Sequence, residues 1–156
     1  MQRELMLIGL WLPLAAFAQT TTTTTRTETH SLAPFGLGST ETARITVVNL
    51  AAASASGTAA SCTGTISFLS STGAVIGTAT TFTIGSSATA TASLPFGSSG
   101  LSGNRGDLRA VISLTRTSGT PCELAASLAT FDTSSGATHL YVADAYPASG
   151  PGPGRF

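Results

Sequence analysis

Hydrophobic and polar residues alternate along most of the chain with a period of two. In TARITVVNL (42–50), for example, Ile45 and Val47 share one side of an extended chain and their polar neighbours share the other. A period of two is typical of β-strands, whereas an amphipathic helix needs a period near 3.6. One apolar and one polar side per strand is the pattern of antiparallel sheets with one packed and one wet face. The pattern therefore predicts an all-β chain.

Six further segments show the same alternation, at 62–68, 78–84, 88–94, 108–116, 122–131 and 137–143. Segments rich in Gly, Ser and Asp separate them and have the composition of turns. About seven or eight short strands joined by such turns indicate two packed sheets. The sequence therefore predicts an antiparallel β-sandwich.

The first 18 residues differ from this pattern, because Leu5 to Phe17 form an apolar stretch. Arg3 before it and AFA (16–18) after it match the charged start and small-x-small cleavage site of a secretory signal peptide. The stretch is shorter than the ~20 residues of a membrane-spanning helix. We therefore expect cleavage before Gln19, a secreted or periplasmic protein, and no membrane contact after cleavage. An uncleaved membrane anchor is the alternative.

Two low-complexity segments flank the predicted domain. Residues 19–25 consist of Gln19 followed by six threonines, which offer no apolar side chain for a core. We expect a disordered, Thr-rich leader there, with a glycosylated stalk as the alternative. Residues 147–156 read PASGPGPGRF and are expected to form a flexible tail, because proline and glycine do not propagate a helix or a ladder. The sandwich domain is thus expected over 26–146.

Charges are few and balanced in this chain. Seven arginines, no lysine and seven acidic residues give a formal net charge of zero at pH 7. Nucleic-acid binding depends on clusters of basic side chains that contact phosphates, and binding to anionic membranes needs similar clusters. The composition therefore argues against nucleic acid and anionic lipid as partners.

The chain has two cysteines, Cys62 and Cys122. An even number in an exported chain favours a disulfide. Each cysteine stands at the head of an alternating segment, so we expect both side chains in one core. A bridge that closes a loop of about 60 residues is worth about 4 kcal/mol. Two buried free thiols are the alternative.

These features together resemble an immunoglobulin-like β-sandwich of the kind common in exported bacterial proteins. The strand rhythm, the segment GLGSTETARITVVNL (36–50) and the spacing of Cys62 and Cys122 carry the resemblance. The chain departs from antibody domains in two respects. Its tryptophan, Trp11, lies in the predicted signal, and Thr120 occupies the position of the tyrosine-corner residue. The resemblance implies a fold and no catalytic or binding residue.

Few residues are candidates for chemistry. His30 and His139 lie among threonines, and we expect them on solvent faces rather than in a zinc site, which needs four ligands. Asp132 in DTSSGAT is expected to cap its own turn, because a calcium loop needs more carboxylates. The tripeptide Arg105-Gly106-Asp107 matches an adhesion motif, but a match of three residues in a glycine-rich turn arises by chance. We expect no catalytic residue, no metal and no cofactor.

The sequence thus favours an exported, non-enzymatic module with a binding or structural role at the cell envelope or outside the cell. A protein or glycan of the envelope is the expected partner. Threonine-rich strands without lysine leave their edges open to self-association, so a fibre or surface-layer subunit is the alternative. A small secreted hydrolase is a further alternative, although no G-x-S-x-G elbow is present.

Overall fold

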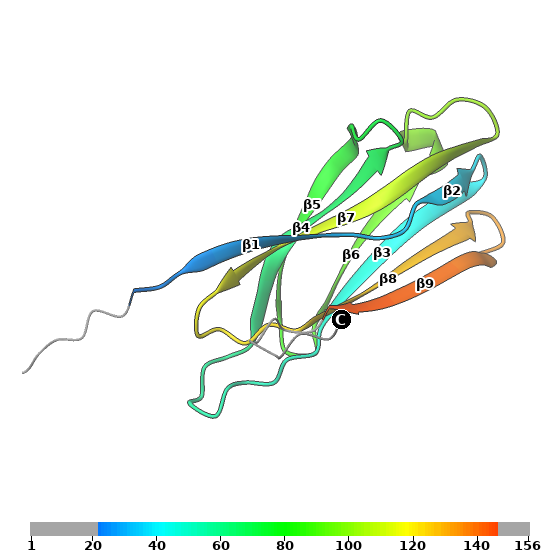
Figure 1. Ribbon diagram of the computed structural model, residues 1–156. Coiled ribbons are helices and arrows are strands. Elements are labelled where there is room, and N and C mark those ends of the chain that lie inside the picture. The colour runs from blue at the N-terminus through cyan, green and yellow to red at the C-terminus, as the bar shows by residue number, and fades with distance from the viewer. Residues whose placement is uncertain (1–21, 147–156) are drawn as a thin grey trace, which may run out of the picture.

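The computed structural model describes residues 22–146, which form a β-sandwich (Figure 1). These residues contain nine strands and one short 3-10 turn, η1 (Phe96–Ser98). The strands are β1 (Thr25–Ser31), β2 (Phe35–Gly38), β3 (Glu41–Asn49), β4 (Ser61–Ser70), β5 (Val75–Gly85), β6 (Thr89–Pro95), β7 (Arg105–Thr117), β8 (Leu124–Asp132) and β9 (Thr138–Tyr146). Within the described residues, no helix has the length and apolar character needed to cross a membrane. The predicted all-β sandwich is confirmed, with nine strands rather than seven or eight.

Two antiparallel sheets make up the sandwich. Sheet A has the strand order β1-β7-β4-β5, and β2 also pairs with β7. Sheet B has the order β6-β3-β8-β9. The hairpins β4–β5 and β8–β9 each stay within one sheet, whereas every other connection from β2 to β8 changes sheet. The chain therefore crosses between the two sheets several times.

The sheet to which the strand after β7 belongs distinguishes this topology from that of immunoglobulin domains. In immunoglobulin domains strand B pairs with E, strand C pairs with F, and the last strand stays in the sheet of C and F. Here β3 pairs with β6 and β4 pairs with β7, but β8 lies in sheet B. The N-terminal strands β1 and β2 occupy the open side of β7 instead. The immunoglobulin likeness therefore stays a prediction.

The core fills the space between the sheets with the apolar side chains that the alternation placed on one face. Its fully buried large members are Leu37, Ile45, Ile66, Leu108, Ile112, Leu114, Leu124, Leu128 and Val47. Gly64 on β4 is needed for this packing, because a Cβ there would lie 2.3 Å from the carbonyl oxygen of Ser113 and 2.8 Å from the ring of Phe82. A larger residue at 64 would push β4 away from β7.

The N-terminal boundary lies one residue earlier than expected. β1 begins at Thr25, within the segment predicted as leader. The backbone N–H of Thr24 donates to Ser118 Oγ (3.0 Å), and the Ser118 N–H donates to the Thr24 carbonyl (2.9 Å). The last threonines thus find partners because β7 continues to Thr117. The predicted signal (1–18), residues 19–21 and the predicted tail (147–156) lie outside the described residues.

Candidate functional site

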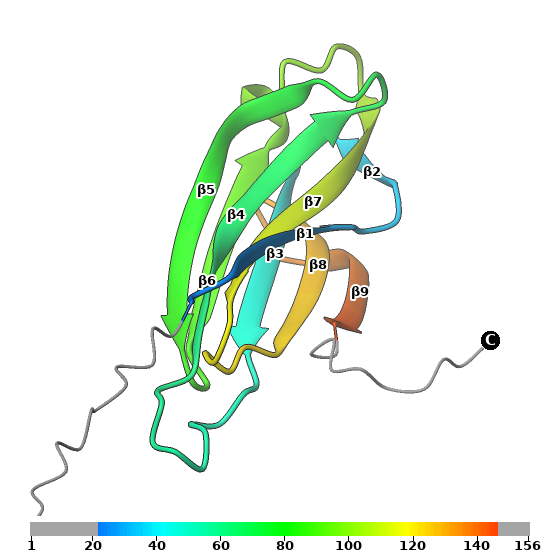
Figure 2. The same ribbon diagram turned by 60° about the vertical axis from the view of Figure 1, so that its left-hand side comes forward.

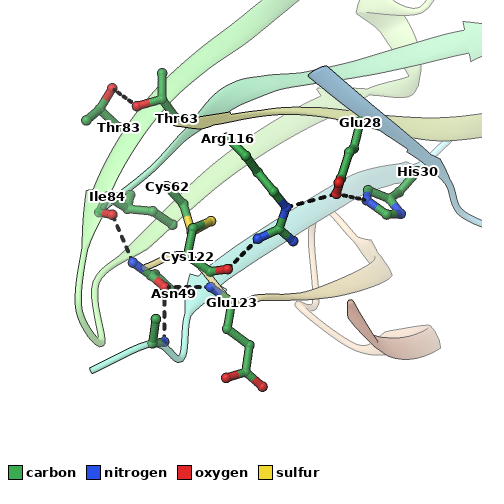
Figure 3. The surroundings of a disulfide bond; sticks show 11 residues. Glu28, His30, Asn49, Cys62, Thr63, Thr83, Ile84, Arg116, Cys122 and Glu123 are labelled. Carbon is green, nitrogen blue, oxygen red and sulfur yellow. Dashed lines mark hydrogen bonds and ion pairs between the residues drawn. A yellow bond between two sulfur atoms is a disulfide. The ribbon is translucent and has the colours of Figure 1, made fainter. Parts of the chain in front are cut away.

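The predicted disulfide between Cys62 and Cys122 is confirmed. Both cysteines are buried, and their Cα atoms are 5.1 Å apart across a sequence separation of 60. Cys62 belongs to β4 of sheet A, and Cys122 lies two residues before the start of β8 of sheet B (Figure 3). The bond therefore staples the two sheets together, and it fits a protein of an oxidising compartment.

Asn49 forms a polar hub beside the disulfide (Figure 3). Its side chain is fully buried at the end of β3. Its amide nitrogen donates to the carbonyl of Ile84 (3.3 Å), and its amide oxygen accepts from the N–H groups of Ala51 (3.1 Å) and Glu123 (3.3 Å). One side chain thus joins the ends of β3 and β5 to the start of β8. Its role is structural, since its hydrogen bonds all go to backbone groups.

Arg116 links this region to the edge strand β1 (Figure 3). Its Nη1 donates to the Cys122 carbonyl, and its Nε donates to Glu28 Oε2 at 2.8 Å. Glu28 pairs with Leu114 of β7 in the sheet register, and His30 pairs with Ile112. Because directly opposite residues point to the same face, Glu28 and His30 point toward the core side of sheet A.

The expectation of a solvent face for His30 is therefore wrong. The side chain is only 26% exposed, and its Nε2 lies 3.8 Å from Glu28 Oε2. β1 carries polar residues on both of its sides, so the sequence pattern did not show which side faces the core. Inward charges on an edge strand are a known means of discouraging unwanted strand pairing.

The second histidine, His139, lies on β9 in the other sheet. Its Nδ1 makes a short hydrogen bond with Glu41 Oε1, and Glu41 Oε2 accepts from the Gly38 N–H at 2.6 Å. The bonds from His139 and Gly38 hold the pKa of Glu41 below the ordinary glutamate value, although burial acts to raise it. The structure does not bring the two histidines together, and no group of three or more metal-ligating side chains occurs within residues 22–146.

Glu41 makes stability depend on pH. Its pKa is lower in the folded than in the unfolded chain, so the unfolded chain binds more protons in acid. We expect the stabilisation to be complete above the ordinary pKa of 4.5 and to be lost as pH falls through the lower folded value. In urea unfolding between about pH 3 and 6, Glu41→Gln should flatten this dependence. Glu123→Gln, at an exposed glutamate, is the control, and equal profiles for both variants would contradict the role of Glu41.

Asp132 caps its own turn as predicted. Its Oδ1 accepts hydrogen bonds from the backbone and hydroxyl groups of Ser134 and from those of Ser135, at 2.6–3.0 Å. These hydrogen bonds, those of Ser134 first, hold the pKa of Asp132 far below its usual range. The tripeptide at 105–107, in contrast, does not lie in a turn. It begins β7 and pairs with β2, so it is part of the sheet.

The outer face of sheet A carries an ordered array of hydroxyl groups. Two rows of four residues each run across β1, β7, β4 and β5, one member per strand. The first row is Thr27, Thr115, Thr63 and Thr83, and the second is Thr29, Ser113, Thr65 and Thr81. We call these eight residues the hydroxyl face. All eight are exposed or half-buried, and none is charged.

Regular spacing distinguishes the hydroxyl face from scattered surface threonines. Neighbours within a row are separated by the strand spacing of about 4.8 Å, and the rows lie roughly 6.7 Å apart, two residues along each strand. Hydroxyls also contact each other within the rows, at 3.4 Å between Thr29 and Ser113 and at 3.2 Å between Thr63 and Thr83. A shallow hollow of about 320 Å³ lies over the centre, lined by five of these residues with Gly64 and Phe82.

The outer face of sheet B has a different character. A hollow of about 330 Å³ there is lined by small side chains and by Tyr141, which is 67% exposed. Nearby, the guanidinium of Arg44 covers the ring of Phe131 at 4.5 Å. This face has a single row of three hydroxyl residues, beside apolar and charged side chains, and it serves below as the comparison surface. The row consists of Thr91, Thr46 and Ser127.

No protein-family model, curated protein or solved structure matches the chain. The case for a function therefore depends on the residues and their geometry. Among the described residues, the hydroxyl face repeats one chemical group in register over four strands and presents it to solvent.

Proposed function

We propose that this chain is an exported, non-enzymatic β-sandwich module, secreted or periplasmic, that binds a neutral glycan of the cell envelope through the hydroxyl face. The alignment of eight hydroxyl side chains over four strands carries this proposal. The sheet register fixes their positions, so binding does not need to order them. The staple between Cys62 and Cys122 supports the same proposal, because it suits a protein that works in an oxidising compartment.

The chemistry of the face selects the class of ligand. Each hydroxyl both donates and accepts hydrogen bonds, as sugar hydroxyls do, and each threonine methyl offers a small apolar contact to sugar C–H groups. One such hydrogen bond contributes only about 0.5–1.5 kcal/mol, so useful affinity requires many at once. A polymer with repeated hydroxyls meets this requirement, and the absence of charge on the eight residues favours a neutral polymer.

Lysine substitution within the hydroxyl face tests the proposal. Thr65→Lys/Thr81→Lys places two long charged side chains at the β4 and β5 positions of the second row, and we expect the apparent affinity for insoluble cellulose or chitin to fall at least about tenfold. Co-sedimentation at several protein concentrations measures this affinity. Thr89→Lys/Thr91→Lys, at exposed threonines of β6 in sheet B, is the matched control and should stay within about twofold of wild type. Failure of the wild type to bind either polymer, or equal loss in both variants, contradicts the proposal.

A second function is favoured by the strand edges. β5 and β6 are edge strands, and neither holds a charged residue. Uncharged edges leave backbone N–H and C=O groups open to pairing with another strand. We infer that copies of the chain also associate with one another, as subunits of a fibre or surface layer.

A further inference from the structure

The N-terminal strand β1 is attached to the sandwich through a single neighbour. Among the described strands it pairs with β7 alone. None of its seven residues is buried, and five are exposed. Little apolar surface is therefore removed from water when β1 docks, so the hydrophobic effect holds it only weakly. Its backbone ladder, the ion pair between Glu28 and Arg116, and the contact between Thr29 and Ser113 hold it in place.

A short exposed link connects β1 to the rest of the domain. The Leu32 N–H donates to the carbonyl of Ala110 (2.9 Å), and pairing with β7 resumes at Phe35. Between them, Ala33 and Pro34 are exposed, and proline has no N–H to donate to a ladder. A turn at 33–34 leaves Phe35 in the core of its own chain, whereas the buried Leu32 moves with β1 and takes the place of Leu32 in the core of the second copy.

The topology creates the place that β1 fills. Because β8 crosses to sheet B, the open side of β7 beyond the four residues that pair with β2 has no described strand other than β1 to cover it. Figure 2 shows β1 as the outermost strand beside β7. A β1 strand from a second copy would meet the same ladder, the same Arg116 and the same Ser113, so it would make the same contacts in trans that it makes in cis.

We propose that β1 is an exchangeable strand, which leaves β7 of its own chain and pairs with β7 of a second copy. This inference rests on the proposed self-association and names how the copies are joined. Reciprocal exchange gives a closed dimer, and exchange in one direction gives an open head-to-tail chain. Because the contacts are identical in cis and in trans, the protein concentration decides which pairing prevails. Exchange becomes favourable when the protein concentration approaches the effective concentration of the chain's own β1, which is on the order of millimolar.

Cysteine trapping across the exchanged pair tests this proposal. Thr29 and Ser113 are directly opposed, so cysteines there lie within reach of a disulfide. A Thr29→Cys chain and a Ser113→Cys chain with different tags are mixed at high concentration and mildly oxidised. Neither chain has a partner for its new cysteine within itself, so a cross-link above the yield of random collision requires β1 of one copy on β7 of the other. We expect at least about tenfold more heterodimer than from Thr29→Cys mixed with Thr91→Cys, whose new cysteine lies on the outer face of β6. Equal yields overturn strand exchange.

Light scattering behind size exclusion, over a concentration series, separates the two proposals. We expect the molar mass of the chain from Gln19 to rise with concentration, and we expect Thr29→Cys/Ser113→Cys in one chain, once oxidised, to stay monomeric. A rising mass without the heterodimer cross-link overturns exchange and leaves association by edge pairing. A constant monomer without the cross-link overturns both. Assembly of the locked double variant to the wild-type extent also overturns exchange.

Discussion

Removal of the disulfide by Cys62→Ser/Cys122→Ser is expected to lower the free energy of unfolding by about 4 kcal/mol, because the unfolded chain regains the freedom of a loop of about 60 residues. For a domain of this size, that loss corresponds to a fall in melting temperature of roughly 10–20 °C. The bond also ties sheet A to sheet B, so its loss should loosen both layers together. Thermal unfolding followed by circular dichroism under oxidising conditions measures the difference.

Two comparisons isolate the effect of the covalent bond. Wild type in the presence of a reductant should melt close to the serine variant. Cys62→Ala/Cys122→Ala avoids placing hydroxyl groups at buried positions, so a higher melting point for this variant than for the serine variant measures that separate cost. If the serine variant has the same melting temperature as oxidised wild type, the disulfide does not add to the free energy of unfolding, and this expectation is contradicted.

Asn49→Ala is expected to destabilise the fold by about 2–4 kcal/mol, because it leaves the N–H groups of Ala51 and Glu123 without their side-chain acceptor and removes the side-chain donor to the carbonyl of Ile84. A buried polar group that loses its partner costs more than an exposed one, which water can satisfy. Urea unfolding gives the change in free energy.

Asn104→Ala is the matched control, since Asn104 is an exposed asparagine in the loop before β7. It should change the free energy of unfolding by less than about 0.5 kcal/mol. In its ionised form, Asn49→Asp keeps an acceptor for the two N–H groups but offers no donor to Ile84, and it places a carboxylate in a buried site. We therefore expect Asn49→Asp to become less stable as pH rises, unlike Asn49→Ala. Equal stability of Asn49→Ala and the control would contradict the role of the hub.

Alternation predicted the strands that have one packed side, because burial of that side imposes a period of two. The segment at 42–50 is an example, and β3 occupies nearly the same residues. The alternation did not predict β1 and β2, for a different reason in each case. β1 has polar residues on both sides, and β2 is only four residues long with two glycines. Their pairing depends on the open side of β7, which no local pattern reveals.

Polar interaction centres were likewise predicted only where their partners lie close to them in the sequence. The turn at Asp132 was predicted because its partners lie within three residues of it. Asn49, Glu41 and Arg116 were missed as interaction centres because each has partners more than 70 residues away in the sequence. The threonine pairs at spacing two were visible in the sequence, but only the register between strands turns them into rows.

The presence of just two cysteines has a consequence for how this protein matures. With one pairing available, oxidation of Cys62 and Cys122 has a single product, and no wrong bridge has to be reshuffled. The bond does have to wait until the chain as far as residue 122 has emerged, which includes all of β4, β5, β6 and β7. A thiol oxidase should therefore be enough to form the disulfide, without a disulfide isomerase. The bond forms late, after the strands that it connects to the rest of the domain have been synthesised.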